Sequence, residues 1–148
     1  MKRGFLFFIY LSITLIILFL FATGSSLLTL SLNEAKTVPL GTFLTWFGIM
    51  ALPRTIYWGS RSLRDPEDQW SRVLSKILNV LLCLTVLWLP IAYLLSGNMA
   101  TNFTGNTETF QGGPTAMNIY WYLTYGLPIA SILILLAYWI GMLVKKFR

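Results

Sequence analysis

The sequence predicts an all-α integral membrane protein with four transmembrane helices, both termini in the cytoplasm, and a long third helix that starts at the cytoplasmic surface. The first observation is composition: 56% of the residues are hydrophobic and 11% are charged, whereas a soluble domain has about 25% charged residues. The second is a set of long apolar segments, and the third is the uneven distribution of basic residues between the loops. Together they predict a single transmembrane domain that covers residues 1–148.

The apolar segments define the predicted spans. Each is near or above the roughly 20 residues that a helix needs to cross a bilayer core of about 30 Å. None has the charged face of an interfacial amphipathic helix. The segments cover about residues 5–23, 39–58, 73–95 and 119–144. They leave a cytoplasmic loop at 59–72 and outer loops at 24–38 and 96–118.

The first segment also resembles a secretory signal peptide in its general plan. Lys2 and Arg3 precede an apolar run, and small residues follow it from Ala22 to Ser25. The apolar run is longer than the 7–15 residues typical of a signal peptide. We therefore expect an uncleaved membrane anchor, and both alternatives give the other three spans the same orientation.

Basic residues set the predicted orientation. All Lys and Arg residues except Lys36 fall on one side of the four-span topology: Lys2, Arg3, Arg54, Arg61, Arg64, Arg72, Lys76, Lys145, Lys146 and Arg148. By the positive-inside rule, this side is the cytoplasm. The expected location is a bacterial inner membrane or its organellar equivalent.

Five of these basic residues surround the cytoplasmic loop. They are candidates for contact with anionic lipid headgroups or an acidic partner, at about 1 kcal/mol for each residue near an anionic surface. The alternative is that they only orient the chain in the membrane. The five residues are Arg54, Arg61, Arg64, Arg72 and Lys76.

Most of the acidic residues gather in the stretch RSLRDPEDQW, at positions 61–70. Asp65 followed by Pro66 is the pattern of a helix N-cap with proline at the first helical position. Glu67 and Asp68 then occupy the first turn, where the helix dipole favours negative charge. A metal or phosphoryl-transfer site is the alternative, but neighbouring helical positions point over a broad arc and do not converge. We expect a helix start.

The fourth segment carries a stripe of small residues. Gly126, Ala130, Ala137 and Gly141 are separated by four, seven and four residues, which places them on one side of a helix. Such a stripe lets another helix approach closely. The sequence predicts a helix-packing interface here, with chance composition as the alternative.

The chain offers little for a cofactor or a transport mechanism. Histidine, the common ligand of haem, copper and zinc, does not occur, so we expect no cofactor held by this chain alone. Bound lipid or pigment at interfaces shared with other subunits is compatible with the sequence. Pro53, Pro90 and Pro128 predict helix kinks, and a gating role for them is left open.

We therefore expect a non-catalytic accessory or structural subunit of a larger membrane complex, such as a respiratory, photosynthetic, secretion or transport assembly. Its partners would be membrane lipids and other transmembrane subunits, and not nucleic acid, because orientation accounts for the net charge of +6. The alternative is a small homo-oligomeric channel or carrier with a neutral pathway lined by Ser, Thr and Asn79. An enzyme is disfavoured because the sequence suggests no nucleophile with a nearby base.

Overall fold

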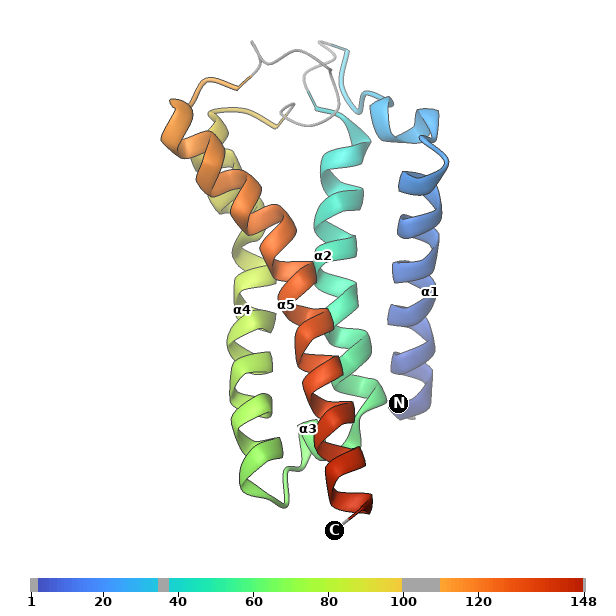
Figure 1. The fold of residues 1–148 in the computed structure, drawn as a ribbon. Helices are drawn as coiled ribbons and strands as arrows, with labels where there is room; N and C mark the ends of the chain where they lie inside the picture. Colours follow the sequence, from blue (N-terminus) through green and yellow to red (C-terminus); the bar gives the residue numbers. More distant parts are fainter. Residues whose placement is uncertain (1–2, 35–37, 100–109, 148) are drawn as a thin grey trace.

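The computed structural model describes residues 3–34, 38–99 and 110–147, and these form a helical bundle (Figure 1). Apart from one isolated bridge between Ser31 and Pro39, the described residues contain helices and their connections. The all-α class predicted from the sequence is therefore confirmed. The elements are α1 (Arg3–Ala22), the 3-10 helix η1 (Ser26–Thr29), α2 (Leu40–Gly59), α3 (Arg61–Arg64), α4 (Gln69–Ser96) and α5 (Pro114–Lys146).

Three of the described helices, α1, α4 and α5, are long and apolar enough to cross a membrane. Helix α2 has the same length as α1, 20 residues, but it is not among these three. It carries threonines and Arg54 between its apolar residues. A membrane location is thus supported by three helices, and the fourth span remains a prediction.

The position of α2 explains its mixed composition. Figure 1 shows α2 between α1 on one side and α4 and α5 on the other, and α2 packs against all three. Its buried residues include Thr42 and Thr55 as well as Ile49 and Ile56. A helix that is surrounded by other helices can carry hydroxyl groups, because its neighbours and its own backbone satisfy them. Helices α1, α4 and α5 lie around α2, and each is covered by other helices along one face only.

Helices α4 and α5 share the most buried part of the core. Trp88 of α4 and Tyr120 of α5 are each 1% exposed, and their rings lie 6.1 Å apart. The indole N–H of Trp88 donates to Oγ1 of Thr124 at 3.0 Å. The same hydroxyl donates to the carbonyl of Tyr120 at 2.8 Å. This buried polar link fixes the register of α4 against α5.

Helices α1 and α2 approach each other through glycine. A Cβ atom added at Gly48 would lie 2.8 Å from Cγ2 of Ile17, and one added at Gly59 would lie 2.9 Å from the ring of Phe7. A side chain at either position would require Ile17 or Phe7 of α1 to shift. The two helices also meet at Thr14 and Thr55, whose hydroxyl oxygens are 3.4 Å apart. These positions were not singled out by the sequence.

One helix proline has a visible structural consequence. Because Pro90 has no N–H, the carbonyl of Val86, one turn earlier in α4, loses its helical partner. The indole N–H of Trp46 in α2 donates to this carbonyl at 3.3 Å and to that of Thr85 at 3.2 Å. The proline therefore creates an acceptor that ties α4 to α2.

The start of α4 differs from the prediction. The sequence placed the N-cap at Asp65 and the first helical position at Pro66, but α4 begins at Gln69 and Asp68 is its N-cap. Asp65 instead ends the short helix α3, where its N–H donates to the carbonyl of Arg61. Asp68 is the better cap because Ser71 offers it both an N–H and a hydroxyl.

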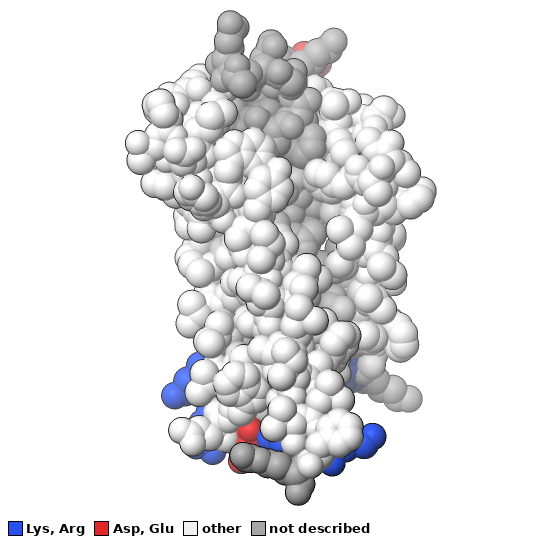
Figure 2. Space-filling model, viewed as in Figure 1, with Lys and Arg blue, Asp and Glu red and all other residues white. Residues whose placement is uncertain are grey.

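The basic residues that the structure describes gather at one end of the bundle, called here the basic end. Both chain termini and α3 lie at this end (Figure 1), and on the visible face the Lys and Arg side chains are confined to it (Figure 2). The predicted charge segregation is therefore present in three dimensions. Lys2, Lys36 and Arg148 lie outside the described residues.

Candidate functional site

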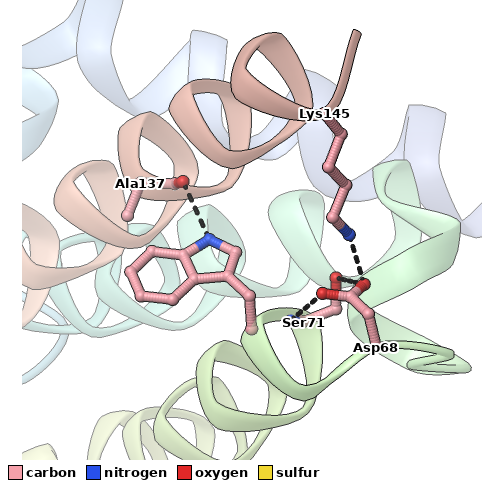
Figure 3. A network of polar contacts seen from close by, with 5 residues as sticks. Asp68, Ser71, Ala137 and Lys145 are labelled. Atoms are coloured by element: carbon pink, nitrogen blue, oxygen red, sulfur yellow. Dashed lines mark hydrogen bonds and ion pairs between the residues drawn. The ribbon is translucent and has the colours of Figure 1, made fainter. Parts of the chain in front are cut away.

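The acidic stretch contributes one carboxylate to a polar network at the basic end. Oδ1 of Asp68 lies 2.6 Å from Nζ of Lys145 and accepts from Oγ of Ser71 at 2.7 Å. Oδ2 accepts from the N–H of Ser71 at 3.2 Å. Figure 3 shows Lys145 reaching from the last turn of α5 to the first turn of α4. The network joins the two helix ends through the ion pair between Asp68 and Lys145.

This network also fixes the ionisation of Asp68. The hydrogen bond from Lys145, followed by the two from Ser71, holds the pKa of Asp68 well below its usual range. Asp68 is therefore negatively charged at neutral pH, at the positive end of the α4 dipole. A carboxylate in this state is suited to capping and pairing and not to proton transfer near neutral pH.

The other acidic candidates do not join this network. Asp65 and Glu67 are exposed, and Pro66 is partly exposed. Within residues 3–34, 38–99 and 110–147, no group of three or more His, Cys, Asp or Glu side chains is placed to hold a metal ion. The described geometry thus gives Asp68 a structural contact and leaves Asp65 and Glu67 at the surface.

The small-residue stripe of α5 is divided by the structure. At the basic end, the indole N–H of Trp70 donates to the carbonyl of Ala137 at 3.3 Å, and a Cβ at Gly141 would lie 2.5 Å from that nitrogen. Ala130 packs against the core. Gly126 is exposed, and a Cβ there would meet nothing within 4 Å. Half of the stripe therefore receives α4 of the same chain.

The five basic candidates also differ from one another. Arg64 donates to the carbonyls of Tyr57 and Trp58 and lies 5.6 Å from the centre of the Trp58 ring. It therefore caps the last turn of α2, where a cation is favoured. Arg54 donates to the carbonyl of Met50 at 3.0 Å. The three that are exposed and available to lipid or a partner are Arg61, Arg72 and Lys76.

The outward face of α4 presents polar side chains in a row, called here the α4 outer face. Arg72, Lys76, Asn79 and Cys83 are spaced by four, three and four residues, and all four are exposed. Within the described parts of the chain, the amide of Asn79 has no hydrogen-bond partner. Because α4 is one of the membrane-compatible helices, this face brings an unsatisfied amide toward lipid or toward another protein.

A groove of about 440 Å³ lies between α1, α2 and α5, and is called here the lateral groove. It is hollowed into the face seen right of centre in Figure 2. Its lining is almost entirely apolar. The residues that line it are Thr14, Ile17, Leu18 and Phe21 of α1, Thr45, Gly48, Ile49 and Leu52 of α2, and Trp121, Thr124, Tyr125, Pro128 and Ile132 of α5.

Several residues that organise these sites were missed from the sequence. Pro90 signals a free carbonyl at Val86, but the donor Trp46 lies about 40 residues away along the chain and is identified only by the fold. Thr124 was hidden because threonine is common in membrane helices and has no spacing rule. Gly48 lies seven residues after Gly41 and eleven before Gly59, which places the three glycines on one side of α2, and this spacing is the signal that could have identified it.

No protein-family model matches the chain, and no curated protein or solved structure is significantly similar to it. No family is therefore assigned. The function is inferred from the molecule's own surfaces, of which the α4 outer face and the lateral groove are the two with defined chemistry.

Proposed function

We propose that this protein is a non-catalytic accessory subunit of a larger membrane complex, and that it docks onto another transmembrane subunit through the α4 outer face. In this proposal the chain spans the membrane four times, with both termini in the cytoplasm. The observation that carries it is Asn79, an exposed amide on a membrane-compatible helix that has no hydrogen-bond partner within the described residues.

The four-span arrangement is supported by the position of α2. It has the length of α1, 20 residues, and runs alongside it in Figure 1. The basic end holds both termini and α3, which is the arrangement that an even number of spans requires. The positive-inside rule then favours the cytoplasm for this end.

The depth of Asn79 makes its exposure costly in lipid. Asn79 lies six residues beyond the start of the predicted span 73–95, which corresponds to about 9 Å along a helix that rises 1.5 Å per residue. A bilayer core is about 30 Å thick. An amide at this depth has no water to bond and loses several kcal/mol if it stays unpaired, on the order of 2–7 kcal/mol. A polar group from a neighbouring helix removes that cost.

The rest of the α4 outer face suits the same partner. Val86 lies seven residues after Asn79, about two turns further along the same side of α4, and is 42% exposed, so it offers apolar contact area. Arg72 and Lys76 lie nearer the basic end on the same face. The expected partner helix therefore carries a polar side chain opposite Asn79 and acidic groups near its cytoplasmic end.

The alternative, a homo-oligomeric channel with a neutral pathway, has less support. Its lumen would need free hydroxyl groups. The hydroxyls of Thr124 and Ser131 are buried, and each donates to a carbonyl one turn earlier in α5, at 2.8 Å. Asn79 faces outward, and it supports docking as well as it supports a pore.

Cys83 allows a direct test because it is the chain's single cysteine and lies one turn from Asn79. A benzophenone attached to Cys83 in native membranes is expected to give an adduct with a different polypeptide. Asn79→Leu should reduce the yield of this adduct, since an interhelical hydrogen bond in a membrane contributes about 0.6–2 kcal/mol. Val80→Leu is the matched control and should leave the yield unchanged.

Two results would count against the proposal. An adduct with the mass of a homodimer, together with ion flux in liposomes that contain this chain alone, would favour the channel. Equal adduct yields from Asn79→Leu and Val80→Leu would remove Asn79 from the interface.

A further inference from the structure

We infer that the lateral groove binds one acyl chain of a membrane phospholipid, from the half of the bilayer opposite the basic end. The inference rests on α1, α2 and α5 and is independent of the proposed docking through α4. Its basis is the groove's position, its chemistry, its size and the aromatic residues at its mouth.

The groove opens sideways toward the bilayer. Helix α2 forms its floor with Gly48 and Ile49, and α1 and α5 form its two walls. Helix α1 begins at the basic end, and the groove lies along its second half, from Thr14 to Phe21. The groove therefore faces the hydrocarbon of the bilayer half that lies away from the basic end.

The shape of α5 opens this space. Pro128 lies inside α5 and lines the groove. Proline removes a helical hydrogen bond and bends the helix at this point. Figure 1 shows the first part of α5, in orange, leaning away from α1 and toward the end of α4. The two walls, α1 and α5, therefore diverge, while α1 remains packed against α2. A wedge-shaped space is left between α1 and α5.

The chemistry of the lining favours a hydrocarbon. None of the lining residues is charged. Its three threonine hydroxyl groups, on Thr14, Thr45 and Thr124, each donate to a carbonyl one turn earlier in their own helix, at 2.8 Å. The other polar groups of the lining belong to Trp121 and Tyr125 at the mouth. A polar ligand would lose its hydration without gaining donors here. An acyl chain has no such cost and gains from close packing.

The size of the groove excludes a helix and admits a chain. Its volume of about 440 Å³ falls within the roughly 300–1,000 Å³ of small-molecule sites. A helix with its side chains is about 10–12 Å in diameter, and three turns of it occupy more than ~1,000 Å³. A transmembrane segment of another subunit would therefore leave most of its volume outside the groove.

The mouth of the groove carries an aromatic pair. The rings of Trp121 and Tyr125 are stacked, with centroids 5.4 Å apart and planes at 12°. Both belong to the part of α5 farthest from the basic end. Trp and Tyr prefer the level of the lipid headgroups, where one side of the ring is apolar and the polar group reaches water. This places the ester region of the lipid beside the pair and its chain in the groove.

A photoactivatable phosphatidylcholine with a diazirine in one acyl chain tests the inference in liposomes containing the full chain. The groove floor belongs to α2 and is reached from lipid through the groove. We therefore expect adducts on Thr45, Gly48, Ile49 and Leu52, assigned by fragment-ion mass spectrometry. These four are counted as the labelling of residues 45–52, and adducts on Phe47, which is 47% exposed outside the groove, are excluded. Ile132→Trp should place its ring in the groove from α5 and reduce these adducts by about tenfold. A tenfold loss of binding corresponds to removing about two methylene groups of the acyl chain from the groove.

Matched controls separate filling from misfolding. Leu133→Trp places the same ring one residue away, outside the groove, and should leave the labelling of residues 45–52 unchanged. A second pair acts from α1: Leu18 lines the groove and Leu15 does not, and they are 59% and 57% exposed. Leu18→Trp should reduce the labelling and Leu15→Trp should not.

Three outcomes would overturn the inference. Labelling confined to outward residues, with none on residues 45–52, would show that no chain enters the groove. Equal labelling of residues 45–52 in the groove variant and the control variant of each pair would show that the lipid does not reach α2 through the groove. A diazirine-bearing isoprenoid that labels residues 45–52 more strongly than the phospholipid would assign the groove to a different ligand.

Discussion

The two halves of the bundle are held together in different ways. Helices α4 and α5 are joined by directional polar contacts, with Trp88 bonded to Thr124 in the core and Asp68 paired with Lys145 at the basic end. Helices α1 and α2 are joined by close approach at Gly48. In a bilayer, apolar side chains gain little by leaving lipid for another helix, so association depends on polar bonds or on tight packing. Polar bonds predominate between α4 and α5, and close approach predominates between α1 and α2, where the Thr14–Thr55 hydroxyl contact at 3.4 Å is the polar addition.

The difference has a consequence for the outer surface. Thr14 and Ile17 are the buried residues of α1, whereas α4 buries residues along its whole length. Helix α1 therefore lies at the periphery of the bundle and is buried along a narrow strip only. The lateral groove has room beside this strip. The half formed by α4 and α5, called here the polar half, is joined by directional bonds that fix the register of the two helices. It carries the α4 outer face that we propose as the docking surface.

Replacing Gly48 tests the close-packed half and should have the largest effect. In Gly48→Val, both methyl groups branch at a Cβ that would already be 2.8 Å from Ile17. Overpacking of this kind costs typically 1–3 kcal/mol and sometimes more, so we expect a loss of about 3 kcal/mol in the free energy of unfolding. The measurement is an SDS titration in mixed micelles.

Gly126→Val is the matched control for this change. It makes the same substitution inside a helix, at a position where a new Cβ meets nothing within 4 Å. Its effect should be limited to helix propensity, well under 1 kcal/mol. If the two variants are equally stable, close approach at Gly48 does not hold α1 to α2.

Removing the Thr124 hydroxyl tests the polar half. In Thr124→Val, the indole N–H of Trp88, whose side chain is 1% exposed, loses its acceptor. An unsatisfied buried donor costs about 1–3 kcal/mol, and we expect about 2 kcal/mol in the same titration. Thr124→Ser keeps the hydroxyl and should recover most of the loss. Similar losses in both variants would show that the methyl group, and not the hydrogen bond, matters.

The two halves also differ in how well the sequence predicted them. Apolar length and charge placement were sufficient for the helices and for the basic end, because both depend on local composition. The α4–α5 contacts were foreseen in part, through the stripe that includes Ala137 and Gly141. The α1–α2 contact was not, although Gly41, Gly48 and Gly59 are spaced by seven and eleven residues and therefore share one side of α2.

The cap of α4 shows the limit of local rules. Asp65 before Pro66 satisfies the N-cap pattern, and so does Asp68 before Gln69. The choice between them depends on Ser71 and on Lys145, which lies far away in the sequence. The lateral groove was also beyond sequence reasoning, because it is a space between three helices and no single segment encodes it.

The smallest expected effect concerns pH and the Asp68–Lys145 pair. Folding lowers the pKa of Asp68 below its ordinary value of about 3.9. The unfolded chain therefore binds the proton more tightly, and the stabilisation from this carboxylate is complete above about pH 5. It declines as the pH falls below 4 and is lost when the pH passes the lowered pKa. Asp68→Asn should remove this contribution, so the wild type should be more stable than the variant near neutral pH and should lose this advantage as the pH falls.

Unfolding midpoints measured from pH 7 to pH 3 check this prediction. The difference between the wild type and Asp68→Asn should be constant near neutral pH and shrink toward pH 3. Glu67→Gln removes a neighbouring exposed carboxylate and should run parallel to the wild type. If the Asp68→Asn difference is independent of pH, the ion pair contributes nothing to the polar half, and the register of α4 on α5 rests on Trp70 and Trp88 alone.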